Sequence, residues 1–177
     1  VDPNKLVARI THVEGRDLTI VNSDRDRNVS YSPDLGMVKL YEGGSVITGD
    51  DTFVEIALLN SRTLIKVAEN THFRLQHVEM QSGQSVFHVI TGRIRSKIDK
   101  LSSKHQFNFI ASNTVSGVRG TDFGISVSGR DPSDADAQIY CFEGEVEVVP
   151  LEYLRPVPTE TFERTVVSAD EMVTVPG

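Results

Sequence analysis

The sequence predicts an all-β fold, an antiparallel sandwich or roll of many short strands with little or no helix. Apolar and polar residues alternate with a period of two in many segments, as they do in a strand with one face in a core. Turn-forming residues (Gly, Asn, Asp and Ser) interrupt these segments at short intervals, which is typical of sandwiches and barrels. A chain of 177 residues can bury a full core, so we expect one domain over residues 1–177.

The strand pattern runs along most of the chain. Leu18 and Ile20 fall on one face of an early segment, and Val38 and Leu40 do so in the next. The same spacing recurs at Val54, Ile56 and Leu58, at Phe73 and Leu75, at Phe107, Phe109 and Ala111, at Phe123, Ile125 and Val127, and at Val146 and Val148. We expect each of these sets to point into the core.

Helical spacing is confined to residues 94–101, where charged residues also fit the outer face of a strand, so we expect a strand that runs into a loop. Three prolines between residues 150 and 158 argue against a regular central strand there. A final short strand is expected over residues 171–175.

Charge and composition narrow the function classes. The formal net charge of −7 argues against nucleic-acid binding, which needs a basic surface. No segment approaches the ~20 consecutive apolar residues of a membrane-spanning helix, so we expect no span in this chain. The single cysteine, Cys141, lies in an apolar segment and is expected to be buried.

The sequence gives little support for a known catalytic or adhesive motif. Residues 122–124 (Asp-Phe-Gly) match a kinase tripeptide, but the phosphate loop and catalytic loop of a kinase are missing. Residues 119–122 (Arg-Gly-Thr-Asp) carry an extra threonine relative to adhesive Arg-Gly-Asp loops, and apolar neighbours draw them towards a core. No Gly-x-Ser-x-Gly elbow is present, so scattered carboxylates would be the only catalytic candidates. We expect a protein that is not an enzyme.

Metal sites are also not predicted. His72, His77, Glu79 and His88 lack the short fixed spacings of a zinc site, so we interpret the histidines as exposed strand residues. Residues 134–145 resemble part of a calcium loop but have isoleucine where the sharp turn requires glycine. We expect no metal and no cofactor.

One concentration of basic residues stands out in this acidic chain. On a strand, Arg93, Arg95 and Lys97 would project together and could bind a carboxylate or a phosphate. They are the candidate binding residues. The alternative is a solvated face whose charges keep a sheet edge from aggregating.

The stretch Val118, Arg119, Gly120, Thr121 and Phe123 predicts a corner between two strands. Gly117 and Gly120 are expected to adopt positive φ, and Thr121 and Asp122 to hydrogen-bond backbone groups of the turn. Arg119 is expected to bridge carbonyls or pair with an acid, and Phe123 to start an inward-facing row. Residues 46–53 resemble residues 117–123, which indicates the same local structure used twice.

Five sequence blocks stand in a fixed order. They are residues 43–50 (Gly-Gly-Ser-Val-Ile-Thr-Gly-Asp), 64–75, 91–94 (Thr-Gly-Arg-Ile), 107–125 with Val-Arg-Gly-Thr-Asp-Phe at 118–123, and Gly-Glu-Val-Glu-Val at 144–148. Together they resemble the FecR domain of bacterial cell-envelope proteins, including iron-dicitrate transmembrane regulators, and its Val-Arg-Gly-Thr-x-Phe hallmark. The resemblance covers residues 39–150, with 1–38 and 151–177 as flanking strands and loops.

The resemblance implies an all-β module outside the cytoplasmic membrane. In the family's regulators this module relays the state of an outer-membrane transporter to a cytoplasmic sigma factor. Because the chain shows neither a sigma-binding segment nor a transporter-contact domain, we expect a non-enzymatic, exported or periplasmic module that binds an envelope protein or relays a signal. The alternative is a binding module for cell-wall glycan or another small envelope ligand, although tryptophan is absent.

Overall fold

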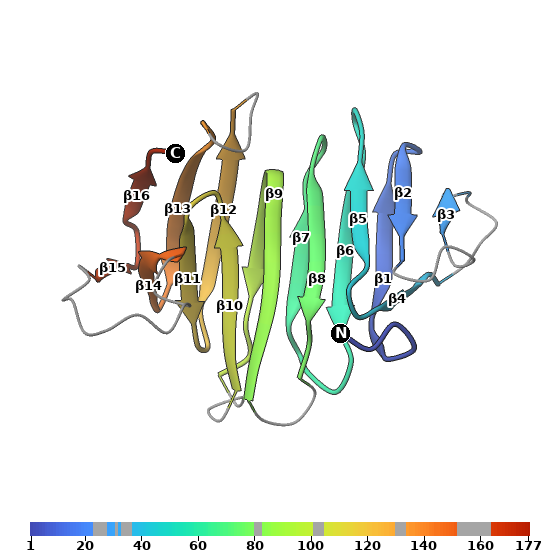
Figure 1. Ribbon diagram of the computed structural model, residues 1–177, viewed down its shortest axis with the longest axis horizontal. Coiled ribbons are helices and arrows are strands. Elements are labelled where there is room, and N and C mark those ends of the chain that lie inside the picture. The colour runs from blue at the N-terminus through green and yellow to red at the C-terminus, as the bar shows by residue number, and fades with distance from the viewer. Residues whose placement is uncertain are drawn as a thin grey trace.

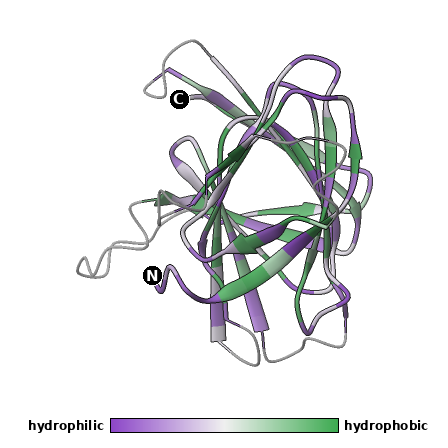
Figure 2. Cartoon of the chain, turned by 90° about the vertical axis from the view of Figure 1, so that its right-hand side faces the viewer, coloured by the Kyte–Doolittle hydropathy of each residue, from purple (hydrophilic) through white to green (hydrophobic). Residues whose placement is uncertain are grey.

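One long strand connects two β-sheets that face each other (Figure 1; Figure 2). The computed structural model describes residues 1–22, 28–30, 32, 37–79, 83–100, 105–129, 134–151 and 164–177. In chain order the strands are β1 (Leu6–Glu14), β2 (Leu18–Val21), β3 (Val29–Ser30), β4 (Lys39–Tyr41), β5 (Ser45–Thr48), β6 (Phe53–Leu58), β7 (Leu64–Val67), β8 (His72–His77), β9 (Gly83–Lys97), β10 (His105–Ala111), β11 (Thr114–Val118), β12 (Asp122–Ser128), β13 (Asp136–Glu143), β14 (Glu145–Pro150), β15 (Thr165–Ser168) and β16 (Met172–Val175).

The two sheets share β9. Sheet A has the order β4-β1-β6-β7-β9-β12-β13-β16. Sheet B has the order β3-β2-β5-β8-β9-β10-β11-β14-β15. The all-β prediction is confirmed. Within the described residues, no helix has the length and apolar character needed to cross a membrane.

Among the described strands, one pair departs from a purely antiparallel arrangement. β9 and β10 run parallel, with Gly83 opposite His105 and Val89 opposite Ala111. β9 leaves sheet B near Gly92 and continues in sheet A as far as Lys97. The chain then re-enters sheet B beside the starting end of β9, so β10 follows the same direction. Local sequence pattern carries no information about this return path.

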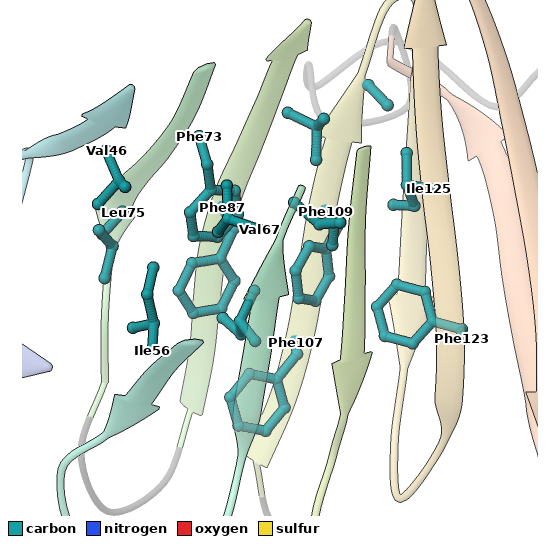
Figure 3. Close-up of a cluster of buried hydrophobic side chains, with 14 of the residues drawn as sticks. Val46, Ile56, Val67, Phe73, Leu75, Phe87, Phe107, Phe109, Phe123 and Ile125 are labelled. Atoms are coloured by element: carbon teal, nitrogen blue, oxygen red, sulfur yellow. The ribbon is translucent and has the colours of Figure 1, made fainter. Parts of the chain in front are cut away.

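The inner faces of both sheets form one apolar core. Every apolar set predicted from the two-residue period is buried, from Leu18 and Ile20 to Val146 and Val148. Figure 3 shows the centre of this core, where the ring centroids of Phe87 and Phe109 lie 5.0 Å apart. Phe109 in turn contacts Phe123 edge to face, at 4.9 Å. This ring contact joins sheet B to sheet A, and such aromatic pairs add to the stabilisation from burial.

Several short links carry the chain from one sheet to the other, and three of them, called corners here, share one geometry. Residues 50–52 (Asp-Asp-Thr) join β5 to β6, residues 69–71 (Glu-Asn-Thr) join β7 to β8, and residues 119–121 (Arg-Gly-Thr) join β11 to β12. The middle residue is left-handed in each corner, with φ of 50° at Asp51, 51° at Asn70 and 57° at Gly120. A left-handed residue turns the backbone sharply, and glycine, asparagine and aspartate tolerate it best.

A buried threonine closes each corner in the same way. The hydroxyls of Thr52, Thr71 and Thr121 each donate a hydrogen bond of 3.0 Å to the carbonyl two residues earlier. All three threonines are almost fully inaccessible to solvent. The hydroxyl therefore satisfies a carbonyl that the sharp turn would otherwise leave unpaired in the interior.

A glycine from a neighbouring segment lies against each corner threonine. Gly15, Gly92 and Gly144 all have positive φ, between 89° and 95°. A Cβ atom at Gly15 or Gly92 would collide with the threonine, whereas one at Gly144 would lie 3.3 Å from the Thr121 hydroxyl oxygen. The corner is thus a repeated three-part unit: a left-handed residue, a threonine and a covering glycine.

Candidate functional site

The predicted hallmark residues form a structural corner. Val118 and Phe123 are buried on either side of it, and Gly120 has the expected positive φ. Thr121 lies 3.0 Å from the Arg119 carbonyl and 3.1 Å from the Glu145 carbonyl, so its hydroxyl ties β11, β12 and β14 together. The prediction for Gly117 was wrong, because this residue lies within β11 and is not among the positive-φ glycines.

The role predicted for Arg119 is not observed. Within the described residues, its guanidinium has no hydrogen-bond or ion-pair partner. Thr121 already bonds the turn carbonyl, and Asp122 pairs instead with Arg95, through contacts of 3.0 and 2.9 Å. The reason is the pairing of β12 with β9, which brings Arg95 beside Asp122 from 27 residues away.

The three candidate binding residues do share one face. Arg93, Arg95 and Lys97 are all exposed on the outer side of sheet A, while the residues between them are buried. Lys66 on β7 lies directly opposite Arg95 and adds a fourth cation. We call Phe53, Lys66, Arg93, Arg95 and Phe142 the cationic face.

Aromatic side chains accompany the cations on this face. The Arg95 guanidinium lies over the ring of exposed Phe142, 4.1 Å from its centroid. The Phe142 ring lies over Gly124 on β12, where a Cβ atom would make an ordinary contact of 3.5 Å with it. This packing and the Asp122 pair hold Arg95 in a defined orientation, whereas Arg93 and Lys66 have no described partner.

A hollow of about 430 Å³ opens on the cationic face. Phe53, Val54, Val67, Ala68 and Ile94 provide apolar lining. Lys66, Arg93 and Arg95 line it from β7 and β9, and His12, Glu14 and Glu55 line it from β1 and β6. Lys97 lines a separate hollow of about 390 Å³ together with Asp122 and Glu143. The structure therefore separates Lys97 from the other two candidate residues.

Sequence reasoning missed a serine–histidine pair. Ser85 Oγ lies 2.8 Å from His105 Nε2, and the Ser85 hydroxyl also accepts a hydrogen bond from the Glu79 backbone N–H. Burial lowers the pKa of His105, and the nearby Glu79 carboxylate opposes this effect. Ser85 has no exposed surface, so its hydroxyl cannot reach a substrate. The two residues lie 20 positions apart in the sequence and meet because β9 pairs with β10, so no local motif could predict this contact.

His77, one of the three histidines named in the sequence analysis, has ion-pair partners. His77 lies between two carboxylates, with Nδ1 3.0 Å from Glu42 and Nε2 3.1 Å from Glu79. Burial alone would raise the pKa of Glu42, but hydrogen bonds from the Val78 and Asp2 backbone amides and the charge of Lys5 lower it. Among the described residues, no group of three or more histidine, cysteine, aspartate or glutamate side chains is arranged to hold a metal ion. The cluster ties the N-terminus to β8.

Comparison with known proteins agrees with this architecture. Two sheets joined by threonine corners define an all-β module in which the hallmark stretch has a structural role. The sequence model of the FecR protein family matches residues 45–147, more than half of the chain. The chain belongs to the FecR protein family, which confirms the resemblance seen in its motifs.

A solved structure shares the fold. It is a proposed anti-sigma factor from Parabacteroides distasonis ATCC 8503, 15% identical in sequence, with a TM-score of 0.51. The match covers 75% of this chain and 59% of that chain, so it spans somewhat more than half of the other protein. No curated protein matches the sequence.

Proposed function

We propose that this FecR domain is a non-enzymatic protein-interaction or signalling module of the bacterial cell envelope, exported to the periplasm. The observation that carries the proposal is the cationic face, where Phe53, Arg93 and Arg95 line a hollow and the exposed Phe142 ring packs against Arg95. Membership of the FecR family supports a regulatory role in the envelope. The burial of Ser85 supports a non-enzymatic one.

The composition of the cationic face favours a protein partner. Arginine and aromatic residues dominate the energetic centres of protein interfaces, because they combine a large apolar area with directed polar contacts. Phe53 is 39% exposed and Phe142 45% exposed, whereas the other described phenylalanines are almost fully buried: Phe73, Phe87, Phe107, Phe109 and Phe123. Lys66 and Arg93 provide cations without described partners. The partner surface we expect is apolar at its centre and acidic towards β7 and β9.

A crosslinking experiment tests this proposal. The full chain, with a photo-reactive residue at position 53, is incubated with envelope extract, and crosslinked proteins are identified by mass spectrometry. We expect one specific envelope protein, lost in Arg93→Glu and retained in Lys39→Glu, which reverses an exposed charge on β4. Equal capture by both variants, or no specific protein, would contradict the proposal.

The periplasmic location is tested separately. The native gene product, expressed with its own flanking sequences, is followed by cell fractionation with cytoplasmic and periplasmic markers. We expect it with the periplasmic or membrane fraction. Recovery with the cytoplasmic marker would exclude export while leaving the interaction surface itself intact.

A further inference from the structure

The arginine of the hallmark corner is not required by the corner. The equivalent positions in the other two corners are Asp50 and Glu69, which carry the opposite charge. All three corners nevertheless have the same left-handed middle residue and the same 3.0 Å hydrogen bond from threonine. The backbone geometry is therefore indifferent to the charge of this side chain, and another reason is needed for Arg119.

Arg119 lines a groove on the outer face of sheet B. This groove, of about 800 Å³, lies over β9, β10, β11 and β14, on a different sheet from the cationic face. Arg119 is exposed and its guanidinium has no partner among the described residues. An unpaired guanidinium offers several donors in a planar fork that matches a carboxylate.

Carboxamides form one wall of the groove. Gln84 lies opposite Gln106 in the parallel pair of β9 and β10, and Gln106 Nε2 donates to Asn108 Oδ1 at 3.3 Å. Asn108 is only 4% exposed, and no described residue accepts a hydrogen bond from its Nδ2 amino group. This Nδ2 atom is not among the buried polar atoms that lack a partner, so it reaches the surface of the groove and can donate to a bound acceptor.

Gly117 forms the floor. It lies between Asn108 and Glu147 in the register of the sheet. A Cβ atom there would make only ordinary contacts, at 3.5 Å from Gln106 Nε2 and 3.6 Å from Asn108 Oδ1. The backbone thus tolerates a side chain at this position, and the absence of one leaves that space open to the groove.

The opposite wall limits the charge of the occupant. Arg164 neutralises Glu147 through a contact of 3.3 Å, while Glu145 adds a negative charge beside Arg119. A run of acidic residues would be repelled by Glu145. A single carboxylate placed at Arg119 would not.

We propose that this groove binds an extended peptide segment of a partner protein through one aspartate or glutamate side chain, which pairs with Arg119. Each carboxamide of the wall can both donate to and accept from a peptide group, which carries one donor and one acceptor. A glycan would need an apolar platform, usually aromatic, and none of the described residues that line the groove is aromatic. The site is independent of the cationic face.

Nuclear magnetic resonance titration of the labelled full chain tests the proposal. The probe is the blocked peptide acetyl-Thr-Val-Glu-Val-Thr-amide at millimolar concentration, and its matched control has glutamine in place of glutamate. We expect chemical shift changes at Gly117, Asn108 and the Arg119 side chain. The affinity should fall about tenfold or more in Arg119→Gln and with the glutamine peptide, as expected for loss of a charge-assisted pair.

Two further variants make the result decisive. Gly117→Leu fills the floor and should abolish binding without unfolding the chain, whereas Lys39→Gln, at an exposed position on β4 of the other sheet, should leave binding unchanged. Absence of shifts, unchanged affinity in Arg119→Gln, or binding of purified muropeptides in preference to the peptide would overturn the proposal. Unfolding of Arg119→Gln would overturn its premise that the corner does not need arginine.

Discussion

The corners at residues 50–52 and 119–121 perform the same task with different side chains. Each carries the chain from sheet B to sheet A, and each uses a threonine hydroxyl to bond the carbonyl two residues earlier. They differ in the first residue, aspartate or arginine, and in the middle residue, aspartate or glycine. The comparison shows that the fold requires a left-handed middle residue and a threonine hydroxyl in each corner. The charge of the first residue is not fixed by the fold and can contribute to a binding surface.

A one-residue shift separates the phenylalanines that follow the two corners. Phe53 comes directly after Thr52 and is 39% exposed, whereas Phe123 comes two residues after Thr121 and is fully buried. Since side chains alternate between the faces of a strand, one position reverses the direction. The similarity between residues 46–53 and 117–123 is therefore one of backbone only.

The largest expected effect tests this difference in direction. Phe123→Ala should lower the free energy of unfolding by about 3–5 kcal/mol, because it removes a ring packed against Phe109 and leaves a cavity. Phe53→Ala should change it by less than about 0.5 kcal/mol. Denaturant unfolding measures both, and similar losses would refute the assignment of the two faces.

The covering glycines offer a second, smaller contrast. Gly92 and Gly144 both have φ of 89°, but only Gly92 lies so close to its threonine that a Cβ atom would collide with it. Gly92→Ala should cost about 2–4 kcal/mol, from backbone strain and overpacking together. Gly144→Ala should lower the free energy of unfolding by less, because it introduces the backbone strain of a positive φ with little overpacking. Thermal unfolding of the pair separates the two contributions, and a reversed order would be inconsistent with the corner geometry.

Removing the corner hydroxyls should have intermediate effects. Thr71→Val deletes a group that donates to the Glu69 carbonyl and accepts from the Arg93 N–H, at 3.0 Å each. We expect a loss of about 1–3 kcal/mol, because buried backbone groups are left unpaired. Thr121→Val should lower the free energy of unfolding by the same amount or slightly less, because it leaves no backbone N–H group without an acceptor. If neither valine variant is destabilised in chemical denaturation, the hydroxyls are not essential to the corners.

The Ser85–His105 pair provides a contrast that depends on pH. It also bonds backbone near a sheet junction, but unlike threonine it can titrate. Burial holds the pKa of His105 below its ordinary value, so the unfolded chain binds more protons in the window below about pH 6.5. Stability should therefore be fully present above that window and fall as the pH drops through it.

Unfolding measured between about pH 7 and pH 5 checks this expectation. His105→Gln should flatten part of the pH dependence. Burial also lowers the pKa values of His72 and His88, with help from Arg74, so these residues should account for a remaining slope of the same sign. A wild-type protein that becomes more stable on acidification would contradict the assigned direction.

The smallest effect is expected from the charge at the corner itself. Arg119→Asp places the residue of the first corner in the third, and stability should change by less than about 0.5 kcal/mol. A larger loss in urea unfolding would mean that the two corners are not equivalent. The fold would then depend on the charge of the first corner residue.

The local sequence pattern predicted the features that depend on neighbouring residues alone. The two-residue period identified the inward residues, and Gly120 with Thr121 marked a corner. Glu69 and Asn70 indicated a turn, but no sequence similarity related that turn to the corners at residues 50–52 and 119–121. Gly117 was misassigned because a glycine within a strand looks the same in sequence as one in a turn.

Long-range pairing could not be predicted from the sequence. The bond of Asp122 to Arg95 depends on β9 lying beside β12, and the Ser85–His105 bond depends on the parallel pairing of β9 with β10. The joint exposure of Arg93, Arg95 and Lys97 followed from alternation alone. Their separation into two hollows required the neighbouring strands.

The shared strand β9 has a consequence for how the chain is made. It covers the free edges of β7 in sheet A and β8 in sheet B. Until residues 83–97 leave the ribosome, both of these edges are open to pairing with another nascent chain. A single segment near the middle of the polypeptide thus covers two aggregation-prone edges at once, and a pause of translation just before it should favour aggregation.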